Sequence, residues 1–569
     1  MKYTLDHLDS LNLNDFLINS AKEYSNRPVL GFVGEKPMTY SEFYDEVNKL
    51  TYHLHEHGVK KFDKVAIWSQ NKPNWAVAFF SIIKLGAVAV PILPDFSIKE
   101  INNILKHSES KVLFISSALY RKIDKETIDA VATIILLKDF TMRISTDEGL
   151  EKGDQFEAFC KEHSKDISQF QNELVCPDDL ASIIYTSGTT GSSKGVMLTH
   201  KNLVANTIQA KAMFDVRPEY RLVSVLPMSH TFEFTLGTLL VIMSGASNYY
   251  LEKPPTAQVL LPALKSIRPQ VMLTVPLIIE KIYKSKIRPE LTGTPVKAFI
   301  YNRIPPLRRL MNLIAGKKLM ATFGGEMIFF GVGGAKLDAE TEKFLKEAHF
   351  PYAIGYGLTE TSPLLAGTDA NGTVLGTIGP CALGVDLKII NLDKETGLGE
   401  IVVKGPNIMK GYYKNDEKTA EVFTHDGYFK TGDTGAFDKK GNLFVKGRIK
   451  TMILGASGEN IYPEEIEAQI NRSDWVLESL VSQVKGQLVA RIHINYEVAD
   501  KYWQDVKDSA SKAEKNMEQF LNDFKNNINK ELNRFSKISS IIEQKDEFIK
   551  TPTKKIKRFL YEEEDEKNK

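Results

Sequence analysis

Short apolar runs that alternate with helical stretches constrain the fold of this chain most strongly. Helical stretches such as Glu340–His349 lie between or beside runs with the length and composition of buried strands. These runs are KVAIW (64–68), ASIIY (181–185), QVMLTV (270–275) and MIFFGV (327–332). Because strands that alternate with helices form largely parallel sheets covered by helices, we predict a large α/β domain of layered sheets.

The pattern changes after about residue 385. The short strands LKIIN, GEIVVKG and NLFVKG stand among glycine turns, which favours antiparallel pairing over residues 385–447. A small basic α+β segment follows, and we expect an amphipathic helix over 514–535 that packs on its own domain. Its apolar positions are Met517, Phe520, Leu521, Phe524, Ile528, Leu532 and Phe535. The 569 residues therefore divide into an expected large domain, 1–447, and a small one, 448–569.

One apolar stretch, Trp75–Leu93, is nearly long enough to span a bilayer. However, Lys84 lies at its middle, and Gly86 and Pro91 interrupt it. We expect a buried helix that passes through a glycine turn into a buried strand.

Composition and charge exclude several classes of protein. Hydrophobic residues make up 43% and charged residues 25%, which is typical of a folded chain and not of a disordered one. A net charge of +1 gives no overall attraction to nucleic acid. The three cysteines, Cys160, Cys176 and Cys381, match neither a zinc nor a disulfide framework, and the N-terminus has no apolar signal segment. We therefore expect a cytoplasmic protein.

A loop rich in glycine and hydroxyl residues follows one of the buried strands. It reads YTSGTTGSSKG, from Tyr185 to Gly195. Glycines let backbone N–H groups turn toward an anion, hydroxyls add donors, and Lys194 supplies charge. The loop is not a Walker A motif, because Ser193 precedes the lysine and Gly195 follows it. A P-loop kinase or ATPase is therefore excluded, although the composition still predicts phosphate binding and not a plain surface turn.

The extended segment YTSGTTGSSKGVMLTH resembles the signature of the adenylate-forming (AMP-binding) superfamily, which includes acyl-CoA synthetases, luciferases and nonribosomal adenylation domains. The resemblance implies that the loop is mobile and holds the β- and γ-phosphates of ATP. It assigns nucleotide contacts to Thr186, Ser187, Gly188, Thr189, Thr190, Gly191 and Lys194, and it assigns Ser187 to the metal site as well.

Further motifs of the superfamily follow in order. LPMSHTFE places His230 at the position that lines the carboxylate and acyl site, although a lone histidine beside an apolar run is more often a core residue. GVGGAKL resembles the segment whose backbone lies against adenine, through Gly333, Gly334 and Ala335. We expect the acyl pocket near His230, Val271–Pro276 and Gly331–Ala335.

YGLTETSP is the most specific of these motifs. By resemblance, Tyr356 stacks on adenine beside Gly357, Thr359 contacts the α-phosphate, and Glu360 holds magnesium. The assignment agrees with the chemistry of Mg²⁺, which prefers a few carboxylate or hydroxyl oxygens together with substrate phosphates.

The last motifs bracket the expected small, mobile domain. YFKTGDTG carries Asp433, which matches the residue that accepts hydrogen bonds from the ribose hydroxyls, and Arg448 matches the second ribose contact. Lys450 matches the hinge between the domains. TPTKKIKR places the catalytic lysine at Lys555.

The resemblance spans residues 38–558 and is closest to long-chain fatty acyl-CoA synthetases. It implies a Mg²⁺-dependent ligase that uses ATP to convert a fatty acid to an acyl-adenylate and then to a CoA thioester. Lys555 would assist the first step, and a rotation at Lys450 would permit the second. Two alternatives stay open: an acyl carrier protein as the acceptor, and a non-catalytic relative that only binds ATP or acyl-adenylate.

Residues 281–318 hold ten basic residues against one acid, Glu290, with apolar residues between them. Such a segment is either a solvated helical surface or a patch that touches anionic lipid on the inner face of a membrane. It could also contact an acidic carrier protein. The basic residues are Lys281, Lys284, Lys286, Arg288, Lys297, Arg303, Arg308, Arg309, Lys317 and Lys318.

Overall fold

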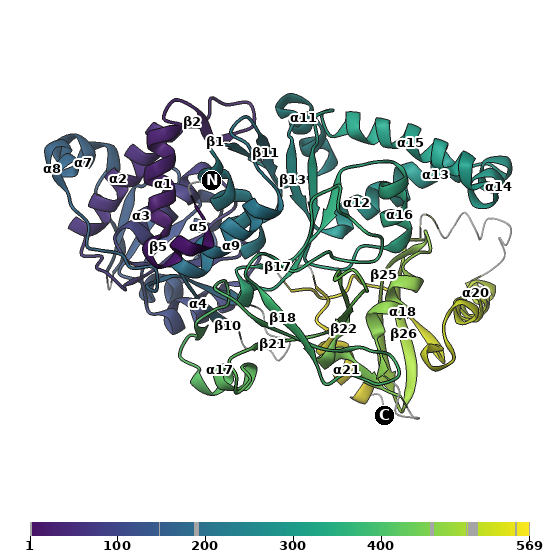
Figure 1. The fold of residues 1–569 in the computed structure, drawn as a ribbon. Coiled ribbons are helices and arrows are strands. Elements are labelled where there is room, and N and C mark those ends of the chain that lie inside the picture. The colour runs from purple at the N-terminus through teal and green to yellow at the C-terminus, as the bar shows by residue number, and fades with distance from the viewer. Residues whose placement is uncertain are drawn as a thin grey trace.

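The computed structural model describes residues 3–146, 148–186, 193–455, 460–496, 498, 510–551 and 555–567. Most of these residues build two large sheets with helices on their faces (Figure 1). All four runs predicted as strands form strands, and Glu340–His349 lies on helix α16 (Ala339–Glu347) apart from its last two residues. The predicted α/β class is confirmed.

The first sheet has seven strands, parallel except at one edge, where β1 and β2 are antiparallel. In order across the sheet they are β15 (Tyr352–Ile354), β14 (Phe329–Val332), β13 (Val271–Thr274), β11 (Arg221–Ser224), β12 (Ser247–Tyr250), β1 (Pro28–Phe32) and β2 (Met38–Thr39).

The second sheet has nine strands: a parallel centre and antiparallel additions at both edges. In order they are β20 (Gly411–Tyr412), β10 (Lys194–Thr199), β9 (Leu180–Thr186), β4 (Val88–Ile92), β3 (Lys64–Trp68), β5 (Ser110–Ile115), β6 (Thr133–Leu136), β7 (Met142–Thr146) and β8 (Gly149–Lys152).

The largest hydrophobic core lies between the two sheets. Side chains alternate across a strand, so Val65 and Ile67 of β3 enter this core while Ala66 and Trp68 enter a second core on the other face. Helices α1 (Leu13–Glu23), α2 (Tyr40–Glu56), α3 (Pro73–Lys84), α9 (His200–Met213) and α10 (Leu240–Ser244) fill the space between the sheets. Helices α11 (Ala257–Ile267), α12 (Pro276–Ile282), α15 (Pro305–Thr322) and α16 cover the outer face of the seven-stranded sheet.

The stretch Trp75–Leu93 has the predicted form. Most of α3 is buried, Gly86 takes a left-handed conformation at φ 76°, and the chain continues into the fully buried strand β4. Lys84 reaches the edge of the core, where its ammonium group lies 4.6 Å from the ring centre of Tyr44. Within the described part of the chain, each helix is too short or too polar to cross a membrane.

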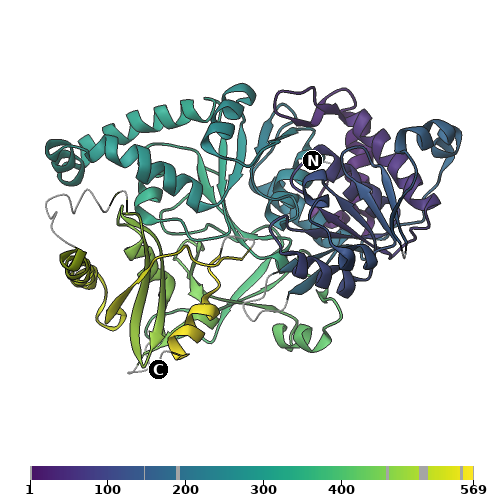
Figure 2. The same cartoon turned by 180° about the vertical axis from the view of Figure 1, so that it is seen from behind.

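The segment predicted to be β-rich forms an antiparallel sheet of β18 (Asp386–Ile390), β19 (Gly399–Lys404), β21 (Phe429–Phe437) and β22 (Leu443–Arg448). The chain then enters a separate small core. It is built from α18 (Pro463–Ile470), β25 (Val476–Val484), β26 (Gln487–Ile494), α20 (Ala510–Glu531) and β27 (Ser540–Gln544). In Figures 1 and 2 this part lies beside α16, away from the N-terminal helices.

The amphipathic helix predicted over 514–535 corresponds to α20. Its apolar face packs on the small core through Leu521 and Ile528, as predicted. The prediction was wrong for Phe535, which is 48% exposed. Helix α20 ends at Glu531, and Phe535 lies in a short 3₁₀ turn whose N-cap, Asn533, redirects the chain.

Candidate active site

The carboxyl ends of neighbouring strands in the seven-stranded sheet bring the expected acyl and adenine residues together. His230 follows β11, Gly333 to Ala335 follow β14, and Tyr356 follows β15. Ligands of open α/β sheets bind at this edge, outside the carboxyl ends of the strands. The arrangement joins the His230 motif to two motifs that lie about a hundred residues or more further along the chain.

Glycine is required at two of these turns. Gly334 has φ 85°, a conformation that L side chains rarely adopt. A Cβ on Gly357 would lie 1.8 Å from the carbonyl oxygen of Pro363, which leaves no room for any other residue. A Cβ on Gly333 would lie 3.0 Å from the ring of Phe232, so the two motifs are in close contact.

The phosphate-type loop connects two antiparallel strands of the nine-stranded sheet. Thr186 ends β9, Lys194 begins β10, and the two residues face each other in the ladder. A Walker A loop instead leads from a strand into a helix, so the topology here differs as well as the sequence. The assigned residues Ser187, Gly188, Thr189, Thr190 and Gly191 lie outside the described residues.

Asp433 and Arg448 face each other on adjacent strands, β21 and β22. Arg448 Nε lies 2.8 Å from Asp433 Oδ1, and the Tyr356 hydroxyl donates to Asp433 Oδ2 at 2.7 Å. Burial raises the pKa of Asp433, and the charge of Arg448 offsets part of that shift. A carboxylate has about four lone-pair sites, so these two contacts leave room for further hydroxyl donors.

Glu360 lies in the short 3₁₀ helix Thr359–Thr361, and its charge acts on Arg448. The Tyr412 hydroxyl donates to Glu360 Oε1 at 2.9 Å, and Lys194 Nζ stands 5.1 Å from the centre of the Tyr412 ring. Tyr412 thus connects the assigned metal ligand to the start of β10. Sequence reasoning missed Tyr412, because a tyrosine after a glycine has no distinctive signal of its own.

Two hydrogen bonds hold the backbone of Lys555 to Thr551. The Thr551 N–H donates to the Lys555 carbonyl at 2.7 Å, and the Lys555 N–H donates to Thr551 Oγ1 at 3.2 Å. Three residues further on, Arg558 forms a two-pronged ion pair with the buried Glu467 of α18, at 2.7 and 2.5 Å. This pair fixes the lysine-bearing segment to the small domain.

Positive charge concentrates around Lys555 and Lys194. Lys555 is exposed as a whole residue, but desolvation of its ammonium group lowers its pKa, and the nearby charge of Arg448 lowers it further, while Asp433 and Glu360 act in the opposite direction. Burial likewise lowers the pKa of Lys194, with added contributions from the charges of Lys418 and Lys450. Cations held this close to one another favour a polyanion between them. The site therefore suits a nucleotide polyphosphate.

His230 lies within the electrostatic reach of Lys555. Burial lowers the pKa of His230 to about 4, and the positive charge of Lys555 adds to the shift. The imidazole is therefore neutral at pH 7, as suits a residue that borders a carboxylate and an apolar chain. The lysine from the C-terminal motif and the histidine from the acyl motif thus share one site.

Glu233 belongs to the same LPMSHTFE motif as His230, and its side chain is buried. Burial raises its pKa to about 7, an effect that hydrogen bonds from Ser224 and Asn248 reduce. Ser224 Oγ donates to Glu233 Oε1 at 2.5 Å, and a Cβ on Gly237 would lie 2.5 Å from the same oxygen. Glu233 therefore anchors the helical turn that follows His230. Sequence reasoning did not assign Glu233 a role, although its place within LPMSHTFE could have drawn attention to it.

Polar contacts join the small domain to the rest of the chain. Lys446 Nζ lies 2.6 Å from Glu465, and Arg288 lies 3.3 Å from Asp474. The Lys284 ammonium also donates to the Asn471 carbonyl. Lys284 and Arg288, two cations of the basic 281–318 segment, thus contact protein and are not a solvated face. Polar, ion-paired interfaces between domains permit relative motion more readily than large apolar ones.

A model of the family described as AMP-binding enzyme matches residues 17–413. The chain belongs to the AMP-binding enzyme family. Among relatives of this AMP-binding enzyme, a long-chain fatty acid–CoA ligase from Mycobacterium bovis is 30% identical over 466 residues, covering 78% of this chain and 75% of the relative. A long-chain fatty acid–[acyl-carrier-protein] ligase from Arabidopsis thaliana is 28% identical over 565 residues, covering 86% and 77%.

Solved structures show the same fold. An anthranilate CoA ligase crystallised with anthranoyl-AMP superimposes with a TM-score of 0.76 at 19% identity, over 99% of both chains. The family and its relatives together identify this AMP-binding enzyme as an adenylate-forming, acyl-activating enzyme.

The proximity of Lys555 to His230 can be tested by titration. We expect Lys555→Ala to raise the pKa of His230, because removal of a nearby positive charge stabilises the imidazolium ion. The pKa should stay below the ordinary value of 6.5, since burial still lowers it. NMR titration of the histidine ring protons, assigned with His230→Gln, measures the shift. Lys557→Ala is the control, and an unchanged pKa in Lys555→Ala would show that the lysine lies elsewhere in solution.

Proposed function

We propose that this enzyme is an ATP-dependent fatty acid ligase that forms an acyl-adenylate and then an acyl-CoA thioester. The observation that carries the proposal is that Lys555 lies within electrostatic reach of Arg448, Asp433 and Glu360 and also of His230. A protein that only binds ATP or acyl-adenylate would have no need for a lysine at position 555. The named long-chain fatty acid ligases among the relatives support the substrate class.

In the first half-reaction, a carboxylate oxygen of the fatty acid attacks the α-phosphorus of ATP. The new phosphorus–oxygen bond forms as the bond to the β-phosphate bridging oxygen breaks, and pyrophosphate leaves. Negative charge accumulates on the α-phosphate oxygens, and a fixed ammonium group in a water-poor cleft stabilises it. Lys555 is the group we assign to this role, with Thr359 as a further contact to the α-phosphate. Lys194 would position the leaving pyrophosphate.

The nucleoside contacts follow from the same geometry. We assign the ribose hydroxyls to Asp433 and Arg448, and the adenine ring to Tyr356 and the exposed backbone turn of Gly334 and Ala335. Tyr356 uses its hydroxyl on Asp433, which leaves the face of its ring available for stacking. The acyl chain would run past His230 along β13 and β14.

The donor set of the cleft fits Mg²⁺. Glu360 offers a half-buried carboxylate beside the lysines that would contact phosphate, and Mg²⁺ commonly takes one or two carboxylates together with phosphate oxygens. Glu360 would hold the ion, with Ser187 as a further assigned ligand. A bound Mg²⁺ supplies Lewis-acid charge neutralisation at the phosphates.

In the second half-reaction, a thiolate attacks the acyl carbonyl, the carbonyl–phosphate bond breaks, and AMP leaves. The thiol needs access to the acyl carbonyl after Lys555 has completed its role in the first half-reaction. We propose that the small domain, 448–569, rotates at Lys450, which lies in a short 3₁₀ turn between β22 and the small core. The ion-paired interface of the small domain supports such a rotation.

A direct assay tests the proposed reaction. Purified enzyme with ATP, Mg²⁺ and a panel of carboxylic acids should release pyrophosphate and, when CoA is added, form a thioester, with the highest kcat/KM for long-chain fatty acids. Holo acyl carrier protein replaces CoA in a parallel arm. Thioester formation only on the carrier protein would favour the alternative acceptor, and absence of pyrophosphate release with every acid would contradict the ligase.

Separation of the two half-reactions tests the role of Lys555. We expect Lys555→Ala to lower the adenylation rate at least about 100-fold, the usual effect of removing a transition-state charge contact. The same variant should still convert supplied acyl-adenylate to thioester at a rate within a few-fold of wild type. Lys557→Ala serves as the matched control in both assays. An equal loss in both half-reactions would contradict the assignment.

We further propose that α15 and the preceding helix α14 (Pro295–Arg303) contact anionic lipid. Leu307, Leu310 and Ile314 follow one another at helical spacing on α15, and all three are exposed. The opposite stripe of α15, with Ala315 and Leu319, packs on the core. The exposed apolar stripe thus has no protein cover in the described structure.

Cations flank this stripe. Arg303, Arg309 and Lys317 are exposed, and the described residues provide them with no ion-pair partner. Arg308 is different, because its guanidinium forms two hydrogen bonds with Glu347 at 3.0 and 2.8 Å. Figures 1 and 2 show α14 and α15 at the outer edge of the molecule. An apolar stripe beside free cations fits an anionic membrane surface, where fatty acids reside.

Vesicle flotation tests the lipid contact. With each surface cation worth about 1 kcal/mol, joint replacement of Arg303, Arg309 and Lys317 by Gln should reduce binding to phosphatidylglycerol vesicles at least about tenfold. The control replaces the exposed lysines Lys99, Lys122 and Lys253 by Gln, which removes the same charge from other surfaces. Equal binding by the two triple variants would contradict the proposal.

A further inference from the structure

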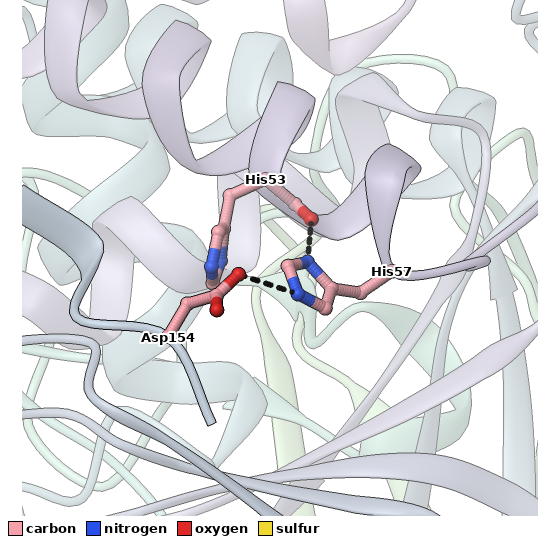
Figure 3. A group of neighbouring side chains, drawn as sticks. All are labelled: His53, His57 and Asp154. Carbon is pink, nitrogen blue, oxygen red and sulfur yellow. Dashed lines mark hydrogen bonds and ion pairs between the residues drawn. The ribbon is translucent and has the colours of Figure 1, made fainter. Parts of the chain in front are cut away.

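A group of metal-ligating side chains lies far from the cleft, where helix α2 ends. His53 is on the last turn of α2, His57 is its C-cap, and Asp154 lies between β8 and α7 (Phe156–Glu162). One nitrogen from each ring and one carboxylate oxygen all lie within 4.8 Å of one another (Figure 3). Two histidines four residues apart project from the same face of a helix, and this spacing recurs in zinc proteins.

The hydrogen bonds of His57 resemble those of a metal ligand. Its Nδ1 lies 2.8 Å from the His53 carbonyl oxygen, and a carbonyl can only accept, so Nδ1 carries the proton. The other nitrogen, Nε2, therefore points at Asp154 Oδ2, 3.0 Å away (Figure 3). Metal-bound histidines commonly donate their second N–H to a backbone carbonyl in this way. With the proton on Nδ1, the lone pair of His57 Nε2 faces a lone pair of the Asp154 carboxylate. This contact is favourable only with a positive charge between the two atoms, which a metal ion or a second proton on the ring supplies.

His53 supplies an independent observation. Its side chain is fully buried, and neither ring nitrogen has a hydrogen-bond partner among the described residues. The rings of Phe156 and Phe159, at 5.4 and 4.6 Å between centres, hold the imidazole in place edge-on. A buried polar atom without a partner is costly, and coordination of a cation would satisfy the nitrogen that has a free lone pair.

We propose that His53, His57 and Asp154 bind a divalent transition-metal ion, with Zn²⁺ as the best fit. Two imidazole nitrogens and one carboxylate oxygen match the ligand preferences of zinc, whereas Mg²⁺ and Ca²⁺ prefer oxygen ligands alone. Asp154 is 52% exposed and His57 24%, so the ion can enter from solvent and keep water in the remaining position.

The ion would act as a cross-link. It would join the end of α2 to the loop before α7, two points about a hundred residues apart in the chain. In Figures 1 and 2, α2 and α7 lie at the end of the molecule away from the C-terminal domain. We therefore expect the metal to raise the thermal stability of this region and to leave the adenylation chemistry unchanged, in contrast to the Mg²⁺ assigned to Glu360.

Titration calorimetry with ZnCl₂ on the tag-free, chelator-treated full-length enzyme tests the site. We expect one saturable zinc site per chain, an increase in Tm with zinc, and the intense visible absorption of tetrahedral Co²⁺ when cobalt replaces zinc. His57→Ala and Asp154→Asn should each weaken zinc binding at least about tenfold. Their retained adenylation activity shows that both variants are folded.

The matched control is His55→Ala. His55 belongs to the same tract, HLHEH, but its ring packs on Phe170 at 4.8 Å between centres and lies outside the group. This variant should bind zinc as wild type does. Absence of saturable zinc binding would leave a His57 imidazolium paired with Asp154 and overturn the proposal. Equal zinc affinity in wild type, His57→Ala and Asp154→Asn would also overturn it, because the ion would then be held elsewhere.

Discussion

The ion pair between the buried Asp433 and the half-exposed Arg448 is the constraint on which the rest of the site depends. It joins two strands of the antiparallel sheet, and the Tyr356 hydroxyl ties it to the carboxyl edge of the seven-stranded sheet. Removal of Arg448 would leave the buried Asp433 carboxylate without its cation, which is unfavourable because a buried charge is then uncompensated. The pair thus fixes the relative positions of three segments, and Arg448 stands two residues before Lys450, the proposed hinge residue.

The cleft carries an electrostatic imbalance that only a bound polyanion relieves. The charges of Lys418 and Lys450 act on Lys194, and the charge of Arg448 acts on Lys555. Burial and these neighbouring charges lower the pKa of Lys194 and of Lys555, so bringing the cations together is unfavourable. Binding of a nucleotide polyphosphate would remove this repulsion, and loss of pyrophosphate would restore part of it. On the proposed function, charge would couple the chemical state of the site to the position of residues 448–569.

Much of the fold could be predicted from the sequence because local patterns agreed with tertiary environment. Runs such as KVAIW are apolar on both faces because their strand is covered on both faces, and Trp75–Leu93 formed the predicted buried helix, turn and strand. Phe535 escaped prediction because helical spacing alone does not reveal where the chain leaves the helix. The N-cap Asn533 decided that point, by binding the backbone N–H groups of Phe535 and Ser536.

The sequence by itself determined the residue types of the cleft: the glycine turns, the acids and the lysine of the last motif. Only the tertiary structure decided which of them meet, because parallel strands carry distant loops to one edge and the strand register sets Asp433 opposite Arg448. The tertiary structure also decided the role of Tyr412, whose partner Glu360 lies far along the chain, and that of Glu233, which is buried. It holds also for His53 and Asp154, since packing of a helix end against a loop a hundred residues later has no local signature.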